Sequence, residues 1–430
     1  MRSKYISIES YGCAMNQGEA RLAGRLLEGY GYQVTEEGIG PEEPDTYLIF
    51  TCFVIEPTER RMWKRIEKLN ERGKRIVVGG CMAAVKGKDI KARYPEVELM
   101  DTMGVENTER SVSDLFGPKR LKGFFNRSPG RSHRIVPIST GCLGNCSYCI
   151  TRLARRKLVS RDPGSIITDV REGVEEGNRE ILLTSQDNGV YGKDRPGGTD
   201  LGSLLDMITG EVSGDYRIRV GMMNPRGASD NLESIMSGFR HGSVFKFFHI
   251  PVQSGSDGIL KAMGRPYSVE EFEGLIHSIR ENFPDLTLST DIIVGYPGET
   301  PEDFKESVSL IEGCKPDVLN ITRFSARPGT RAYDSDEGIP GWVLKERSRE
   351  MTRTHERIVR GVLRKRLGEH ESCLVTEIGK PGTMMARDRN YTPIVIRGDK
   401  SLLGRFVDIV TTEVGSTYLM GGDWDLSPME

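Results

Sequence analysis

The 430-residue sequence has no apolar run long enough to cross a bilayer and no signal peptide at Met1. It also lacks solenoid repeats, low-complexity tracts, and the glycine spacing of a Walker or Rossmann loop. Its 8 cysteines are not spaced like the paired framework of a secreted domain. We therefore expect a monomeric protein of two or three domains in a reducing cytoplasm, with no membrane partner.

Excess charge of one sign is also lacking, because the formal net charge is only -2. Basic residues are instead concentrated locally, first in a linker at 117–134. The linker carries Lys119, Arg120, Lys122, Arg127, Arg131 and Arg134, with Phe124, Phe125 and His133 between them. Basic residues interleaved with aromatic rings suit a nucleic-acid backbone with base stacking, and a solvated interdomain linker fits the pattern equally well.

Residues 1–116 read as a small α/β domain with a parallel sheet. The patterns predict strands at Tyr5–Ser10, Thr46–Phe50 and Arg75–Val78, and helices at Gly18–Tyr30, capped by Asn16, and Thr58–Arg72. A cysteine follows each strand: Cys13, Cys52 and Cys81. Taken singly, each is typical of a small buried hydrophobe, but strand ends in a parallel sheet meet at one edge. Together they favour a second cluster site.

The most specific motif is a C-x3-C-x2-C loop formed by Cys142, Cys146 and Cys149. A closed structural zinc site uses four ligands, whereas three thiolates on one loop leave one iron of a four-iron cluster open. No fourth cysteine lies nearby. The spacing favours an iron–sulfur cluster over a zinc knuckle that borrows a distant ligand.

Residues 135–366 alternate strand and helix about six times, which predicts an incomplete (β/α)6 barrel, open on one side for a large substrate. The expected strands are Ile135–Ile138, Glu180–Thr184, Tyr216–Val220, Val244–Ile250, Leu286–Val294 and Val318–Phe324. The expected helices are Gly164–Glu176, Leu201–Val212, Asn231–Phe239, Val269–Asn282 and Glu302–Gly313, followed by a long basic helix at Trp342–Leu367. Asp162, Ser268 and Thr300 are good helix starts. Chemistry is expected at the carboxyl ends of the strands, where the Cys142 loop lies.

Residues 367–430 change to short alternating strands, which predict a small antiparallel β-barrel. The expected strands are Glu371–Glu377, Thr383–Arg387, Thr392–Ile396, Gly404–Thr412 and Tyr418–Gly421. A positive, aromatic-bearing face would suit RNA, although a barrel of this size need not bind nucleic acid. Its candidate residues are Arg387, Arg389, Tyr391, Arg397, Lys400 and Arg405.

The cysteine loop on a first βα unit resembles the radical S-adenosylmethionine (SAM) superfamily, in which the cofactor chelates the open iron and is cleaved to a 5′-deoxyadenosyl radical. The segments His249–Asp257, Met263–Tyr267 and Ser289–Thr300 resemble the methylthiotransferases, as do the first three cysteines and the TRAM-like final barrel. Three segments are similar in sequence to the archaeal and eukaryotic branch of this family, which acts on threonylcarbamoyladenosine. They are Cys142–Cys149, Leu182–Gly192 and Gly221–Pro225. The resemblance covers nearly the whole chain.

This resemblance implies two 4Fe–4S clusters, one on Cys142, Cys146 and Cys149 and an auxiliary one on Cys13, Cys52 and Cys81. It also implies SAM-binding roles for further residues. Gln186 would contact the amino group of SAM and Arg161 its carboxylate. The ribose or sulfonium contacts would be Asn224, Gln253 and Ser254, while Val294 would frame adenine. The segment Ala154-Arg155-Arg156 departs from the glycine that follows the arginine in many relatives, which leaves the role of Arg155 open.

The implied reaction converts N6-threonylcarbamoyladenosine at tRNA position 37 to its 2-methylthio derivative, with the anticodon arm as partner. Our hypothesis uses two equivalents of SAM and an amino-terminal domain that caps the open barrel. The electron and sulfur donors are not given by the sequence. The alternatives are a methylthiotransferase for isopentenyladenosine tRNA or a ribosomal-protein aspartate, and a zinc-stabilised RNA-binding protein without enzymatic activity.

Overall fold

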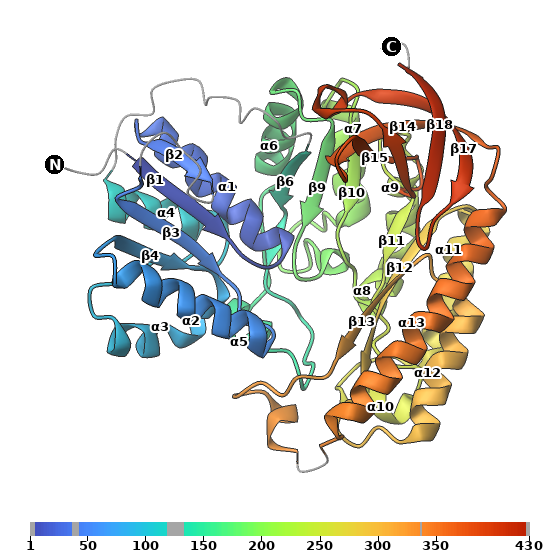
Figure 1. Ribbon diagram of the computed structural model, residues 1–430, viewed down its shortest axis with the longest axis horizontal. Coiled ribbons are helices and arrows are strands. Elements are labelled where there is room, and N and C mark those ends of the chain that lie inside the picture. The colour runs from blue at the N-terminus through green and yellow to red at the C-terminus, as the bar shows by residue number, and fades with distance from the viewer. Residues whose placement is uncertain (1–4, 37–42, 118–132, 336–337, 427–430) are drawn as a thin grey trace.

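The computed structural model describes residues 5–36, 43–117, 133–335 and 338–426. It contains an amino-terminal sheet, a central curved set of strands and a carboxyl-terminal barrel (Figure 1). Most of the predicted linker, 118–132, lies outside the described residues. No helix in the described ranges is long and apolar enough to span a membrane.

The amino-terminal domain contains a five-stranded parallel sheet in the order β2-β1-β3-β4-β5. Alternate residues of β3 point to opposite faces, so Leu48 packs with α1 and α4 while Ile49 packs with α2 and α3. The elements are β1 (Tyr5–Ser10), α1 (Ala14–Gly29), β2 (Gln33–Glu36), β3 (Thr46–Thr51), α2 (Glu56–Asn70), β4 (Arg75–Gly79), α3 (Gly80–Arg93), β5 (Glu98–Leu99) and α4 (Val105–Phe116). The predicted parallel α/β domain is confirmed.

One helix start was predicted wrongly. Helix α1 has Cys13 as its N-cap, so Asn16 lies inside the helix instead of capping it. The Asn16 side chain donates to the carbonyl oxygens of Tyr11 and Thr51, at 2.8 and 2.9 Å. Asn16 therefore joins the ends of β1 and β3.

The central domain has six parallel strands in the spatial order β6-β9-β10 and β11-β12-β13. The two groups are joined by a parallel bridge between Ile218 and Val244. The strands are β6 (His133–Pro137), β9 (Glu180–Thr184), β10 (Arg217–Val220), β11 (Phe247–His249), β12 (Thr287–Val294) and β13 (Val318–Arg323). This arrangement confirms the expected incomplete barrel.

Helices on the outside of these strands enclose the largest apolar core. They are α6 (Pro163–Glu175), α7 (Leu201–Glu211), α8 (Pro225–Asp230), α9 (Leu232–Phe239), α10 (Asp257–Ala262), α11 (Val269–Asn282), α12 (Pro301–Cys314) and α13 (Gly341–Arg364). The predicted helix starts at Asp162, Ser268 and Thr300 are N-caps whose side chains accept backbone N–H bonds. The short helices α8 and α10 were not predicted.

The amino-terminal domain lies across the open side of the barrel (Figure 1). On one edge, helix α1 packs on β6, and a Cβ at Gly18 would lie only 3.0 Å from Ile135. On the other edge, Glu59 of α2 pairs with the buried Arg327, which follows β13. The amino-terminal domain therefore contacts the first strand of the barrel, β6, and the segment that follows its last strand, β13.

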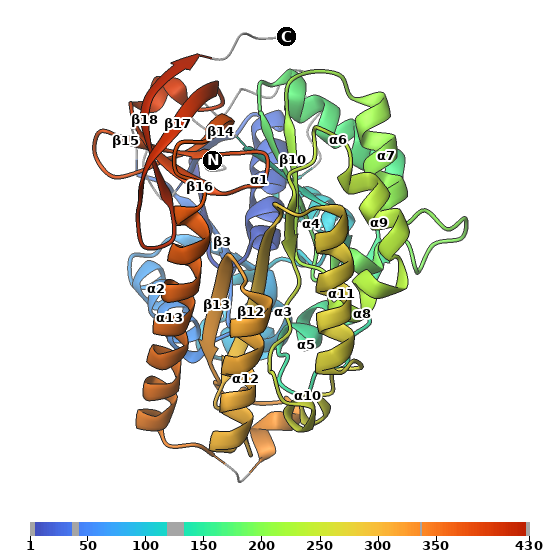
Figure 2. The same cartoon turned by 90° about the vertical axis from the view of Figure 1, so that its right-hand side faces the viewer.

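The carboxyl-terminal domain is a closed barrel in the order β14-β15-β16-β18-β17, reached through α13 (Figure 2). Its strands are β14 (His370–Ile378), β15 (Thr383–Arg387), β16 (Pro393–Arg397), β17 (Phe406–Val414) and β18 (Leu419–Leu426). All pairs are antiparallel except β16 with β18, where Ile394 and Val395 pair in parallel with Leu419 and Met420. The prediction of a purely antiparallel barrel is corrected at this closing pair.

Candidate active site

The Cys142 loop leaves the first strand of the barrel through the short ribbon β7 (Ser139–Thr140) and β8 (Val159–Ser160), with α5 (Thr151–Arg155) between them. Gly141 makes the turn into the loop with a φ of +83°. A Cβ on Gly141 would lie 1.8 Å from the carbonyl oxygen of Lys157, so only glycine fits. The base of the loop is thus packed directly against the returning chain.

The same loop is attached to loops on the far side of the barrel mouth. The backbone N–H of Ser147 donates to Met263 at 2.9 Å, and its hydroxyl lies 2.8 Å from the Tyr296 hydroxyl. Tyr148 and Tyr296 meet edge to face, with ring centroids 6.4 Å apart. The loop is therefore held by segments that follow α10 and β12.

The three thiols of this loop suit a cation. Burial, together with the nearby charges of Asp187, Cys146 and Cys149, raises the pKa of Cys142 to about 11. Burial likewise raises the pKa of Cys149. Metals bind the thiolate, and a bound cation reverses this penalty because it neutralises the gathered negative charge. The Gly144 N–H also donates to the Cys142 sulfur at 3.2 Å.

The second set of thiols lies at adjacent strand ends. Cys13, Cys52 and Cys81 follow β1, β3 and β4, which are neighbours in the sheet. A Cβ on Gly12 would lie 2.9 Å from the Cys52 sulfur, so the Cys13 loop packs on Cys52. Burial raises the pKa of Cys81 to about 11, and the charge of Arg155 opposes that rise. The three cysteines thus follow neighbouring strands at the same end of the sheet, and the shared cluster site stays a prediction.

Neither thiol set forms a compact mononuclear site. Within the described ranges, no three Cys, His, Asp or Glu side chains are grouped closely enough to hold a single metal ion. A four-iron cluster has a different requirement, because each cysteine binds its own iron. Three thiols on one loop therefore fit a four-iron cluster, in which each thiolate binds a different iron.

Two predicted SAM contacts already have protein partners. The side-chain oxygen of Gln186 accepts the Gly141 N–H at 2.7 Å, so Gln186 supports the start of the cysteine loop. The guanidinium of Arg161 donates to the Pro137 carbonyl at 2.6 Å and pairs with Asp169 at 3.3 Å. The SAM roles of both residues stay predictions.

The remaining predicted contacts lie at strand ends around the barrel. Asn224 caps α8, and its backbone N–H donates to Asp187 at 3.0 Å. Gln253 has a φ of 78° and pairs with β12 through its backbone. Ser254 is buried, with its hydroxyl 3.4 Å from that of Ser307. Val294 ends β12 and is fully buried.

Two buried charged residues near the loop were not predicted. Burial raises the pKa of Asp187 to about 6. Arg265 is 8% exposed and donates to the Tyr148 hydroxyl at 2.6 Å. Arg265 has no carboxylate within ion-pair distance in the described part of the chain. It lies inside the quoted Met263–Tyr267 segment, whose resemblance was the only available signal.

The structure separates the predicted basic surface into exposed and internal residues. Arg134 is buried among Asp169, Glu172 and Glu176, so it is a structural residue rather than an RNA contact. Tyr391 is also buried, and Arg387 lies over its ring at 4.5 Å. The exposed members in the barrel are Arg389, Arg397, Lys400 and Arg405.

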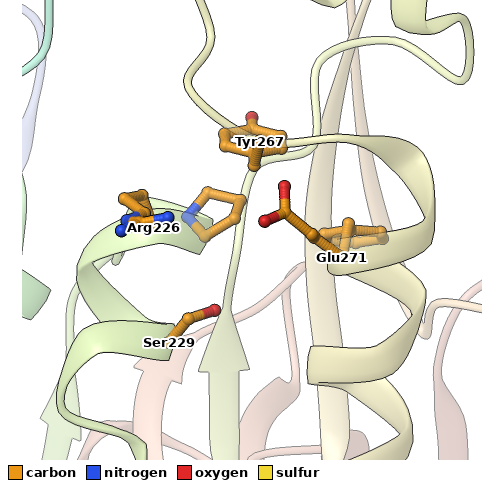
Figure 3. Close-up of a pocket in the computed structure, with 6 residues that line it drawn as sticks. Arg226, Ser229, Tyr267 and Glu271 are labelled. Atoms are coloured by element: carbon orange, nitrogen blue, oxygen red, sulfur yellow. The ribbon is translucent and has the colours of Figure 1, made fainter.

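A small pocket of about 190 Å³ lies between α8 and the start of α11 (Figure 3). It is lined by Pro225, Arg226, Ser229, Tyr267, Glu271 and Phe272. None of these is a cysteine or a predicted SAM contact. Tyr267 connects the pocket to the core, because its hydroxyl donates to the carbonyls of Pro251 and Val252.

Comparison with known families agrees with this architecture. Residues 136–311 match the radical SAM superfamily, residues 5–101 match the uncharacterized protein family UPF0004, and residues 364–422 match the TRAM domain. The fold and the cysteine loop thus define a radical SAM enzyme, and this class implies SAM and a 4Fe–4S cluster.

The relatives narrow the class. The chain is 38% identical to a probable threonylcarbamoyladenosine tRNA methylthiotransferase of Pyrococcus horikoshii, over 97% of this chain and 98% of that protein. It is 36% identical to the Archaeoglobus fulgidus protein of the same description, over 97% and 98%. The human threonylcarbamoyladenosine tRNA methylthiotransferase is 30% identical over 97% of this chain and 73% of its own length. The chain belongs to the threonylcarbamoyladenosine tRNA methylthiotransferase family.

Solved structures share the fold at low identity. The radical SAM methyltransferase TsrM of Kitasatospora setae superposes with a TM-score of 0.55 at 13% identity, over 77% of each chain. The cobalamin-dependent radical SAM enzyme OxsB gives 0.51 at 13% identity, over 86% of this chain and 62% of that one. These two matches support the fold alone.

Proposed function

We propose that this enzyme converts N6-threonylcarbamoyladenosine at tRNA position 37 to 2-methylthio-N6-threonylcarbamoyladenosine. The observation that carries the proposal is the placement of two cysteine triads at the junction of two domains. One triad lies on the barrel loop and the other at the facing sheet edge, linked by the ion pair between Arg155 and Glu19. The sequence relatives supply the substrate class.

The proposed domains are 1–116, which holds the auxiliary cluster, linker 117–134, barrel 135–366 and TRAM-like barrel 367–430. Cys142, Cys146 and Cys149 would hold the radical cluster, and Cys13, Cys52 and Cys81 the auxiliary cluster. With SAM bound, the radical cluster supplies the chemistry needed at the adenine C–H bond, which protein acids and bases cannot activate. The chain itself positions the thiols and covers the open barrel.

The SAM contacts proposed from the sequence are Gln186, Arg161, Asn224, Gln253, Ser254 and Val294. Buried Arg265 joins them as a cation beside the cysteine loop. Its charge offsets the negative charge of the loop thiolates, and Tyr148 fixes its orientation.

Two cysteine variants separate the proposed roles of the triads. Cys146→Ala should abolish 5′-deoxyadenosine formation from SAM. Cys81→Ala should retain that cleavage and lose methylthiolated tRNA. Formation of 5′-deoxyadenosine by Cys146→Ala would contradict the role of the loop.

Nucleoside mass spectrometry tests the substrate. Cells lacking the gene should lose 2-methylthio-N6-threonylcarbamoyladenosine and regain it from the plasmid-borne gene, but not from its Cys146→Ala variant. Loss of methylthiolated isopentenyladenosine, or of a methylthiolated ribosomal-protein aspartate, would instead support the other branches. An unchanged level of 2-methylthio-N6-threonylcarbamoyladenosine in cells lacking the gene would reject the proposed substrate.

The tRNA would bind through exposed basic residues of the final barrel and α13. Arg349, Arg353 and Arg360 line the exposed side of α13, and Arg397 and Lys400 lie exposed on the barrel. Each phosphate contact contributes about -0.7 to -0.9 to the slope of log K against log salt. Arg397→Gln with Lys400→Gln should weaken tRNA binding and flatten that slope, whereas Lys88→Gln on the exposed side of α3 should not.

A further inference from the structure

Arg155 belongs to the central domain, and its side chain contacts the residues around the amino-terminal thiols. It ends α5, six residues after Cys149, and its side chain is only 1% exposed. Its guanidinium donates to both carboxylate oxygens of Glu19 on α1, at 2.7 and 2.8 Å. A buried bidentate pair of this kind fixes both position and orientation.

The remaining contacts of Arg155 reach the cysteine loops. Its guanidinium donates to the Asn16 side-chain oxygen at 3.1 Å. The amide of Asn16 in turn holds the carbonyls of Tyr11 and Thr51, which lie beside Cys13 and Cys52. A second branch reaches the Thr140 hydroxyl at 3.3 Å, next to the turn that starts the Cys142 loop. One guanidinium thus contacts the supports of both triads.

The charge of Arg155 also acts on the thiols directly. Burial is the largest effect and lowers the pKa of Arg155. The charge and hydrogen bonds of Glu19, together with Cys81 and Cys13, raise that pKa on balance, so the cation persists. The charge of Arg155 and its hydrogen bond with the Cys81 thiol both lower the pKa of that thiol. A buried cation beside these thiols suits a bound cluster, because nearby charge sets the cluster potential.

We propose that Arg155 is a positioning residue that fixes the distance between the two cluster sites and raises the reduction potential of the auxiliary one. The proposal rests on the proposed auxiliary cluster. A purely structural ion pair would join the two domains equally well, but it would leave the potential unchanged when the charge is altered.

The test uses the full chain with Cys142, Cys146 and Cys149 changed to Ala, so that iron reports only the auxiliary site. In this background, Arg155→Gln should lower the midpoint potential of the cluster followed by electron paramagnetic resonance. Glu19→Gln should raise it, because the cation then lacks its counter-charge. The exposed neighbour Arg156, changed to Gln, is the matched control and should leave the potential unchanged.

The positioning role is tested with all six cysteines present. Arg155→Lys keeps the charge and loses the bidentate geometry, so it should retain the potential and lower methylthiolated tRNA per 5′-deoxyadenosine roughly 10-fold or more. A potential that moves in neither Arg155→Gln nor Glu19→Gln overturns the electrostatic role. If Arg155→Gln does not load iron, Glu19→Gln alone decides. Absence of iron from the parent background instead overturns the auxiliary cluster itself, and this proposal with it.

Discussion

The side-chain oxygen of Gln186 lies 2.7 Å from the backbone nitrogen of Gly141, although the residues are separated by 45 positions. Gln186 follows β9, the neighbour of β6 in the sheet, so the second strand of the barrel supports the loop that follows the first. This bond satisfies a backbone N–H at the point where the chain turns into the cysteine loop. Loss of this acceptor should therefore destabilise the cysteine loop itself, independently of any contact between Gln186 and a cofactor.

Replacing Gln186 tests this support. Gln186→Leu leaves the N–H of the buried Gly141 without its acceptor, which costs about 1–3 kcal/mol. Gln186→Glu keeps an acceptor at the same place. In a chain lacking Cys13, Cys52 and Cys81, iron content then reports the radical site alone. We expect Gln186→Leu to lose iron and Gln186→Glu to retain it; equal retention would contradict the supporting role.

Gly141 itself is expected to be irreplaceable, for two separable reasons. Its positive φ strains any L side chain by roughly 1–2 kcal/mol, and its Cβ would collide with Lys157. Gly177 has a φ of +91° with nothing within 4 Å of a built Cβ, so Gly177→Ala measures the strain alone. Urea unfolding should show the greater destabilisation in Gly141→Ala, together with loss of iron at the Cys142 site. Similar losses in both variants would mean that the collision relaxes.

The sequence predicted the elements with strong periodicity and missed those defined by distant partners. Alternation identified six barrel strands, and side-chain caps located helix starts such as Ser268. Short edge strands such as Glu98–Leu99 carry too few residues to form a pattern. Asn16 is a residue type that often caps helices. Here its side chain instead donates to the carbonyls of Tyr11 and Thr51, and Asn16 lies inside the helix.

The candidate site shows the same division. The loop cysteines follow from local spacing, and the cysteines after three strands follow from the rule for parallel sheets. The pairing of Arg155 with Glu19 spans 136 positions and joins two domains, which no local pattern encodes. The burial of Tyr391, predicted as an exposed RNA contact, depends on how the final barrel packs on the central one.

Tyr391 is expected to hold these two domains together. Its hydroxyl donates to the buried carboxylate of Glu180 on β9, at 2.6 Å, and Arg219 lies over its ring at 4.9 Å. Tyr391→Phe removes the hydroxyl donor from the buried carboxylate, which should cost about 1–3 kcal/mol of unfolding free energy. Tyr333→Phe, at a residue 47% exposed, is the matched control. Equal urea midpoints for the two variants would show that the hydroxyl is dispensable.

Asp317 should make stability depend on pH. Burial raises the pKa of Asp317 to about 6, although the Leu288 N–H donates to its carboxylate at 2.9 Å and lowers that pKa. In the unfolded chain an aspartate titrates near its ordinary pKa of about 3.9. The folded state therefore binds the extra proton between these values. The stabilisation from protonated Asp317 is complete below about pH 4 and is lost as pH rises through about 6.

Asp317→Asn should remove this dependence while keeping an acceptor for Leu288. From pH 5 to 7.5 the wild type should lose about 1.4 kcal/mol of unfolding free energy relative to the variant, because roughly one pKa unit of the shift is titrated in that interval. Urea unfolding at matched ionic strength measures the gap, and Asp285→Asn at an exposed position is the control. A gap between wild type and Asp317→Asn that stays constant across this interval would mean that Asp317 is already ionised in the folded protein at pH 5.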